Sequence, residues 1–179
     1  MRLDKALNLV IPIDNDDGRI YVHSTPVSRE VFEKYFLAIS KTFAAIYSEG
    51  LNVLAGPRVA ALMLRQVSND LGIDTGLIDE IRRLSNVIVA GKPVPLEVAL
   101  NQGVLSAEDY REAEGMIVFF ICVSAMHKRS LVASILAEMC GLWASGTTLS
   151  NCTEYANSLP TSIETASSGE TVTPSVIPS

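Results

Sequence analysis

The first 24 residues carry a pattern of apolar and polar positions that predicts two β-strands. The segments LNLVIPI (Leu7–Ile13) and RIYVHS (Arg19–Ser24) are rich in β-branched and aromatic residues, and the polar DNDDG between them ends in Gly18. Two such runs joined by five residues that include Gly are typical of a β-hairpin. Pro12 has no N–H to donate, so we expect it at a sheet edge or near a strand end. An isolated hairpin is marginal in water, so this one must pack against the rest of the chain.

From residue 28 onward the apolar spacing changes to three and four residues, which predicts a series of helices. The first helix begins after the N-cap Ser28 and ends at Gly50, and the second has Pro57 at its first position and ends at Gly72. Shorter helices are expected in TGLIDEIRRLSNVIV, followed by an extended piece at Val87–Val89, and in PLEVALNQG. The pattern therefore predicts a mainly helical α+β fold with an N-terminal β-hairpin.

The segment GMIVFFICVSAM (Gly115–Met126) is apolar on all sides, so a helix there must be buried on more than one face. This helix begins after Ser106, and Asp109 three residues later gives a variant of the capping box. The stretch is far shorter than the ~20 residues that span a bilayer, so we expect no contact with a membrane. Two further helices are expected in SLVASILAEMCGLWASG, capped by Ser130, and in LSNCTEYANSL.

The composition changes near Pro160. Ser and Thr make up about half of the remaining residues, and no Lys or Arg follows Arg129. Such a segment buries too little apolar area to offset backbone ordering, which costs roughly 1–2 kcal/mol per residue. We therefore expect one compact domain over residues 1–159, made of the hairpin and the helices, and a disordered tail over residues 160–179.

Charge and cysteine content limit the possible functions. The net charge is −6 and the pI is about 4.9, which argues against a protein that neutralises nucleic-acid phosphates. The cysteines Cys122, Cys140 and Cys152 are odd in number and fit neither a disulfide framework nor a metal motif. We therefore expect a reducing compartment, no cofactor and no nucleic-acid partner.

His23 and His127 are the two histidines of the chain. His23 stands beside Ser24, but neighbours on a strand point to opposite faces, which argues against a nucleophile–base pair. His127 lies in MHKR at a helix C-terminus, where a cation complements the helix dipole. The alternative for His127 is a small anion or partner site. We predict no catalytic residue and expect a protein that is not an enzyme.

Two charged clusters have ordinary explanations. DNDDG brings three carboxylates together, but Thr25 stands where a calcium loop needs a glutamate, so these residues are expected to form a solvated turn without a metal. Glu80 and Arg83 lie at helical spacing and predict a surface ion pair. A modest basic patch would form if the helices that carry four arginines adjoin, namely Arg58, Arg65, Arg82 and Arg83.

Six stretches together resemble a family of tail assembly chaperones encoded by long-tailed bacteriophages of enteric bacteria. They are MRLDKALNLVIPI, GRIYVHSTPVSREVFEKYF, GLNVLAGPRVAALML, EIRRLSNVIV, VFFICVSAMHKR and SLPTSIETASSGETVTPSVIPS. The resemblance implies a non-catalytic protein of the host cytoplasm that is absent from the mature virion. It would bind the tape measure protein and help tail tube subunits polymerise, recruiting the tail tube protein through a longer, frameshifted form.

Apolar surface of this kind also favours a homo-oligomer, because large apolar patches rarely stay exposed. One hypothesis places the partner contact where the core meets the tail, and the alternative is ordinary packing of terminal helices onto the core. The residues concerned are Leu142, Trp143, Leu149, Tyr155 and Leu159. The alternative function is a structural tail or head–tail connector component that stays in the virion.

Overall fold

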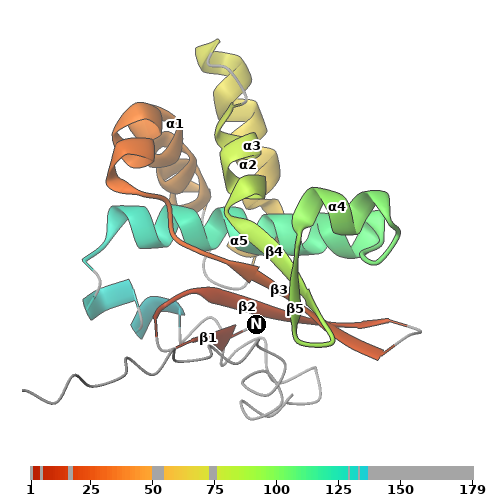
Figure 1. The fold of residues 1–179 in the computed structure, drawn as a ribbon. Coiled ribbons are helices and arrows are strands. Elements are labelled where there is room, and N and C mark those ends of the chain that lie inside the picture. The colour runs from red at the N-terminus through yellow and green to blue at the C-terminus, as the bar shows by residue number, and fades with distance from the viewer. Residues whose placement is uncertain are drawn as a thin grey trace, which may run out of the picture.

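Figure 1 shows the computed structural model of the chain. It describes residues 2–4, 6–15, 18–49, 55–72, 76–128, 130–132 and 134–136. The described chain is mostly helical and begins with an antiparallel β-hairpin, which confirms the expected α+β class. The helix expected in LSNCTEYANSL, the domain boundary at 159 and the tail over 160–179 lie outside the described residues.

The strands form one antiparallel sheet with the order β1-β2-β3-β4-β5. Their bounds are Arg2–Leu3 for β1, Leu9–Asn15 for β2, Gly18–Ser24 for β3, Ser85–Val89 for β4 and Lys92–Pro95 for β5. β2 and β3 form the predicted hairpin, but its bounds differ from the prediction. β2 begins at Leu9, because Leu7 belongs to a turn in which its N–H donates to the Asp4 carbonyl, and Asp14, Asn15 and Gly18 lie in the strands rather than in the connecting turn. β1 pairs only with Leu9 and Val10, so Pro12 lies on a part of β2 that is the sheet edge within the described chain. This is the kind of position expected for a residue that cannot donate a ladder hydrogen bond.

The helices begin and end close to the predicted residues. Their bounds are Arg29–Ser48 for α1, Gly56–Leu71 for α2, Gly76–Arg83 for α3, Leu96–Asn101 for α4 and Ala107–Met126 for α5. Ser28 Oγ accepts a hydrogen bond from Val31 N at 3.2 Å, and Ser106 Oγ accepts one from Asp109 N at 3.1 Å. Gly72 ends α2 with a left-handed φ of 61°. These caps are local, which is why the sequence reveals them.

The helix predicted to begin with Ser130 as its cap differs from the structure by two residues. Residues 130–132 and 134–136 are helical, and the Lys128 carbonyl already accepts hydrogen bonds from the N–H groups of Leu131 and Val132. An N-cap residue is the one whose carbonyl accepts the first bond of the helix, so Lys128 takes that place. Ser130 therefore lies inside the first turn, and the prediction that it caps the helix was wrong.

Helix α5 is the centre of the molecule. It runs between the sheet on one side and α1 and α2 on the other (Figure 1). Every residue from Ala113 to Val123 is buried, and Phe119 and Phe120 are among the largest fully buried side chains. This confirms the expectation that the apolar half of the helix is buried on more than one face.

Ala90 in the β4–β5 turn has a strained backbone conformation. Ala90 and Gly91 are the two residues between the paired Val89 and Lys92, and both have positive φ, 48° and 78°. Two-residue hairpin turns of this kind favour Asn followed by Gly. We expect Ala90→Asn to raise the free energy of unfolding by about 0.5–1 kcal/mol, since a left-handed conformation costs an ordinary residue roughly 1–2 kcal/mol. Urea denaturation followed by circular dichroism measures the change.

A matched control is Ala44→Asn, because Ala44 is exposed on α1. There the same exchange should lower stability, by up to about 0.7 kcal/mol, since asparagine is a poorer helix former than alanine. A gain at both positions, or a loss at Ala90, would contradict the strain argument.

Candidate interaction surface

His23 and Ser24 lie on opposite faces of β3. Ser24 is fully buried in the core and its Oγ accepts a hydrogen bond from Ser85 Oγ at 3.0 Å. His23 Nε2 lies 3.3 Å from Asp4 Oδ2 on the other face. The predicted separation of this histidine from its neighbouring serine is confirmed, so the two cannot act together as nucleophile and base.

His127 is the C-cap of α5. Its backbone N–H donates to the Val123 carbonyl at 3.2 Å, and its Nδ1 lies 3.1 Å from the same oxygen. The imidazole ring also meets Phe43 of α1 edge to face, with 5.3 Å between ring centroids. His127 thus stands at the helix end that the sequence predicted, and the ring contact joins the end of α5 to α1.

The hairpin carboxylates and the central cysteine have structural surroundings. Asp14 pairs with Arg19 across the hairpin at 2.6 Å, and this hydrogen bond lowers the pKa of Asp14. Asp16 and Asp17 lie outside the described residues, and within the described part of the chain no three His, Cys, Asp or Glu side chains form a metal-binding group. Complete burial raises the pKa of Cys122 to about 12, which keeps it a thiol. A buried thiol of this kind packs as a small hydrophobic side chain.

The four arginines do not form the basic patch that the sequence suggested. Arg65 of α2 and Arg82 of α3 do approach each other, but they meet around the carboxylate of Glu114 on α5. Arg83 pairs with Glu80 on its own helix at 2.5 Å, which confirms that predicted ion pair. Glu114 was not among the predicted residues because its partners lie 49 and 32 residues away along the chain, the differences 114 − 65 and 114 − 82.

The Glu114 side chain is 5% exposed, and three groups surround it. Arg65 Nη2 lies 2.5 Å from Oε2, the Tyr110 hydroxyl donates to Oε1 at 2.7 Å, and Arg82 Nη2 is 3.9 Å from Oε1. Arg82 Nε also donates to the Tyr110 oxygen at 3.0 Å. Burial, together with the neighbouring carboxylate, raises the pKa of Tyr110 to about 12 and so keeps its proton in place. The network joins α2, α3 and α5, which is a structural role.

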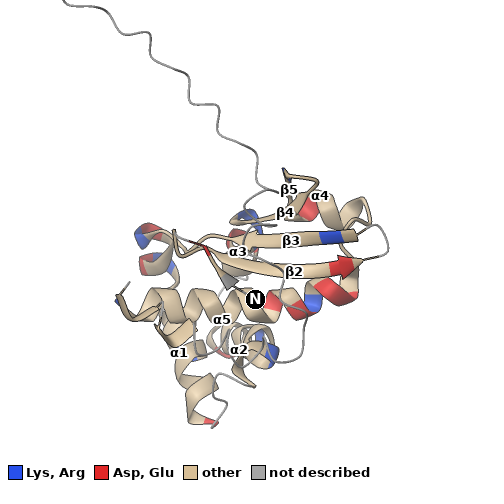
Figure 2. Cartoon of the chain, turned by 90° about the horizontal axis from the view of Figure 1, so that it is seen from below, with Lys and Arg blue, Asp and Glu red and all other residues tan. Residues whose placement is uncertain are grey.

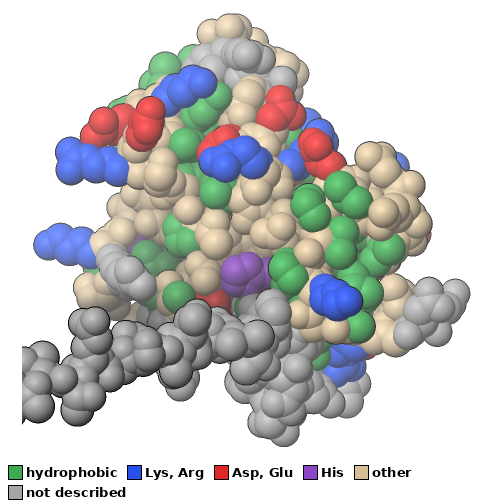
Figure 3. Space-filling model, viewed as in Figure 1, with side chains coloured by type: hydrophobic (Ala, Val, Ile, Leu, Met, Phe, Trp, Pro, Cys, Tyr) green, Lys and Arg blue, Asp and Glu red, His purple; other side chains and the backbone are tan. Residues whose placement is uncertain are grey.

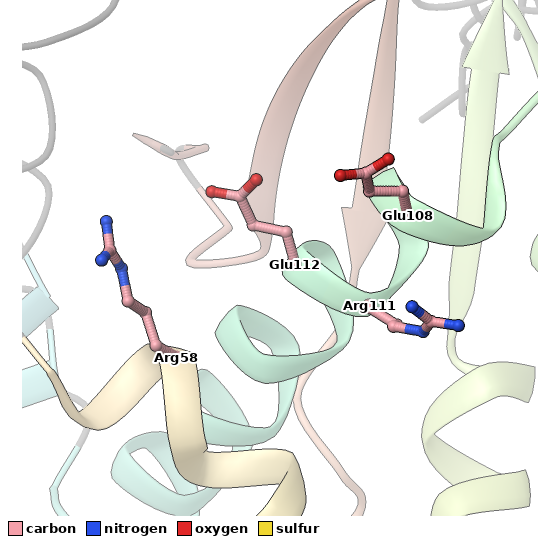
Figure 4. Close-up of a pocket in the computed structure, with 4 residues that line it drawn as sticks. All are labelled: Arg58, Glu108, Arg111 and Glu112. Atoms are coloured by element: carbon pink, nitrogen blue, oxygen red, sulfur yellow. The ribbon is translucent and has the colours of Figure 1, made fainter.

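Arg58 lies apart from this network, at a shallow cleft of about 450 Å³ between α2 and the first turns of α5. Glu108, Arg111 and Glu112 line the rest of the cleft, so its lining contains two acidic and two basic side chains. Figure 4 shows Arg58 and Glu112 extending to the same side while Arg111 points away from it. A lining of mixed charge favours neither an anionic nor a cationic ligand.

Helix α1 carries four aromatic side chains that we name the aromatic ridge: Phe36 and Tyr47, which are exposed, and Phe32 and Phe43, which are half-buried against the core. Phe36 is 50% exposed and Tyr47 is 42% exposed. The rings pair along the helix, Phe32 with Phe36 at 5.6 Å and Phe43 with Tyr47 at 4.6 Å between centroids. Phe36, Ile39 and Ile46 recur along α1 at spacings of three and seven residues, but only the latter two are fully buried. The apolar arc of α1 is therefore wider than the face that the core covers.

A second, smaller apolar area lies near β5, at one edge of the sheet. Hydrophobic side chains gather over α4 and β5 in the space-filling view (Figure 3). Val98 of α4 is 40% exposed, and Pro93 and Pro95 of β5 are exposed beside it. Prolines on an edge strand prevent further strand pairing, so this area is suited to side-chain contact rather than to sheet extension.

The predicted partner contacts Leu142, Trp143, Leu149, Tyr155 and Leu159 lie outside the described residues. Within the described chain the aromatic ridge is the largest group of exposed aromatic side chains on one element. No described helix is both long and apolar enough to cross a membrane. Comparison of the chain with protein-family models, with curated proteins and with solved structures found no match.

Proposed function

We propose that the chain is a non-catalytic tail assembly chaperone of a long-tailed bacteriophage, and that it binds the tape measure protein through the aromatic ridge. The observation that carries the proposal is the exposure of Phe36 and Tyr47, at 50% and 42%, on a helix whose other face is buried. The six segments that resemble the chaperone family support it independently, and two of them include parts of α1 and α5.

The ridge suits a long helical client. Aromatic rings offer large, rigid apolar area, and an amphipathic client helix places its apolar side chains at spacings of three and four residues along such a surface. A single contact of this size is weak. Many chaperone copies on one client bind together far more tightly than one copy does, provided that neighbouring copies are held close.

The same protein also takes part in tail assembly. The protein acts in the host cytoplasm, self-associates along its client and leaves before the virion is complete. The tail tube protein is recruited by a longer, frameshifted form. Mass spectrometry of purified virions distinguishes this role from that of a retained tail or head–tail connector component, because only a chaperone is missing from the particle.

Replacing two ridge residues tests the client contact. We expect the double variant Phe36→Ser, Tyr47→Ser to lose most of its ability to keep a co-expressed tape measure protein in the soluble fraction, because it removes the most exposed rings of the ridge. The fraction of client in the supernatant, compared with expression of the client alone, is the measurement.

Leu62→Ser is the matched control, since Leu62 is 64% exposed on α2 and outside the ridge. This variant should protect the client as well as the unmodified chain does. If the unmodified chain itself leaves the client insoluble, the chaperone function is wrong. If the ridge variant and the control protect equally, the function stands and the ridge is not its contact.

A further inference from the structure

The sheet has a second buried apolar cluster on the face that turns away from the helices. Leu9, Ile11 and Val22 point to one face and join the main core. Val10, Tyr21 and Ile88 point to the other face and form a separate cluster, with exposures of 2%, 5% and 4%. Tyr21 stands directly opposite Ile88 in the β3–β4 pairing. The two clusters are therefore separated by the sheet itself.

Helices α1 to α5 all lie on the side of the main core, above the sheet in Figure 1. Figure 2 shows the molecule from below, which is the side away from these helices. A tyrosine side chain carries on the order of 150–250 Å² of surface, so it cannot reach 5% exposure on a bare sheet face. Its burial requires a covering layer, and that layer is none of these five helices.

The surroundings of the cluster fit a covered face. The Asp14–Arg19 ion pair and the His23–Asp4 contact stand on the same face around the apolar centre. An apolar centre with a polar rim is the usual arrangement of a surface that another segment covers. Pro93 and Pro95 of β5 disfavour the pairing of another strand at that edge of the sheet. A further segment is therefore better placed on this face than at the edge.

The chain itself supplies enough residues to cover this face. Leu136 is fully buried, and 43 residues follow it, the difference between 179 and 136. The first of them bring the apolar side chains Leu142 and Trp143. Strands lie ~4.8 Å apart, so five strands are ~19 Å across, and six extended residues reach about 20 Å. The segment after Leu136 can therefore cross the whole sheet.

We propose that residues 137–159 dock on this second face of the sheet and cover Val10, Tyr21 and Ile88. Leu142, Trp143, Leu149, Tyr155 and Leu159 provide the apolar side chains of the contact. The inference goes beyond the proposed function and does not depend on it. Under it, these five residues pack onto their own chain and the aromatic ridge is left as the surface for a partner.

Trp143 is the single tryptophan of the chain, so its fluorescence reports on this contact alone. In the unmodified 179-residue chain, at low micromolar concentration, we expect blue-shifted emission and weak quenching by acrylamide. Tyr21→Ser should shift the emission to longer wavelength and raise the quenching constant several-fold. If Tyr21→Ser fails to fold, Ile88→Thr retains the β-branched shape on the same face and should move both values in the same direction.

Phe36→Ser is the matched control, because it removes an aromatic ring from the ridge on the helical side. Its emission and quenching should equal those of the unmodified chain. Equal quenching in the control and in both face variants would overturn the proposal. Protection of Trp143 that appears only as the protein dimerises would show that a second copy, not the same chain, makes the contact. Protection that appears only after the tape measure protein is added would show that the client makes it.

Discussion

Glu114→Ala is expected to lower the free energy of unfolding by about 3 kcal/mol, because removing one partner of a buried ion pair leaves the other charges uncompensated. Glu114 is 5% exposed and accepts hydrogen bonds from Arg65 and Tyr110. The expected cost lies at the lower end of the range for such pairs, since Arg65 is 39% exposed and regains water when its partner is lost. Chemical denaturation of purified protein measures the change.

Glu112→Ala is the matched control on the same helix, because Glu112 is exposed. It should alter stability by no more than about 0.5 kcal/mol. The double variant Arg65→Leu, Glu114→Leu should cost less than the sum of its two single variants, since groups in direct contact do not add independently. Equal losses for Glu112→Ala and Glu114→Ala would show that the network does not hold α2 and α3 to α5.

Local signals made most of the helical part of the fold predictable. Ser28, Gly72 and Ser106 are helix caps whose partners lie within three or four residues, so the sequence contains the whole motif. The hairpin of β2 and β3 is equally local, because its turn and both strands fall within 16 residues, from Leu9 to Ser24.

The rest of the sheet was not predictable in this way. β1 has two residues, too few to show an alternation, and β5 is Lys-Pro-Val-Pro, whose prolines argue against a strand. Both are edge strands that exist because a neighbour offers pairing groups. The sheet therefore has five strands where the pattern predicted a hairpin and a short extended piece.

The candidate sites depend even more on distant contacts. Arg65, Arg82 and Glu114 come from three helices, and only the packing of α2 and α3 against α5 brings them together. One signal did exist, since Glu114 directly precedes the uninterrupted apolar run that begins at Gly115. A carboxylate at that position on a buried helix requires a cation from elsewhere.

The width of the apolar arc on α1 was a second signal. Eight apolar side chains larger than alanine occur from Val31 to Ile46, which is more than one helix face needs, and only Ile39 and Ile46 among them are fully buried. The excess is the aromatic ridge. Sequence periodicity shows which apolar residues share a helix face, but it does not show which of them a neighbouring helix covers.

Gly115→Ala tests how closely α2 and α5 approach each other. A Cβ at Gly115 would lie 2.3 Å from the Pro57 carbonyl oxygen, which is a backbone atom and cannot move without shifting α2. Overpacking of a core costs up to about 3 kcal/mol, whereas alanine gains at most about 1 kcal/mol over glycine as a helix former. We therefore expect a net loss of about 2 kcal/mol, measured as a lower denaturation midpoint.

Two comparisons decide whether the backbone contact is the cause. Gly56→Ala should cost less, because its Cβ would meet the Phe119 ring at 2.7 Å, and a side chain moves more easily than a backbone. Ser124→Ala, on a half-buried turn of the same helix, should stay within about 0.5 kcal/mol of the unmodified protein. A gain in stability from Gly115→Ala would mean that helix propensity outweighs the contact and that α2 does not lie this close to α5. If the loss of stability is largest for Gly115, smaller for Gly56 and smallest for Ser124, then Gly115 is the residue that allows Pro57 to pack closely against α5.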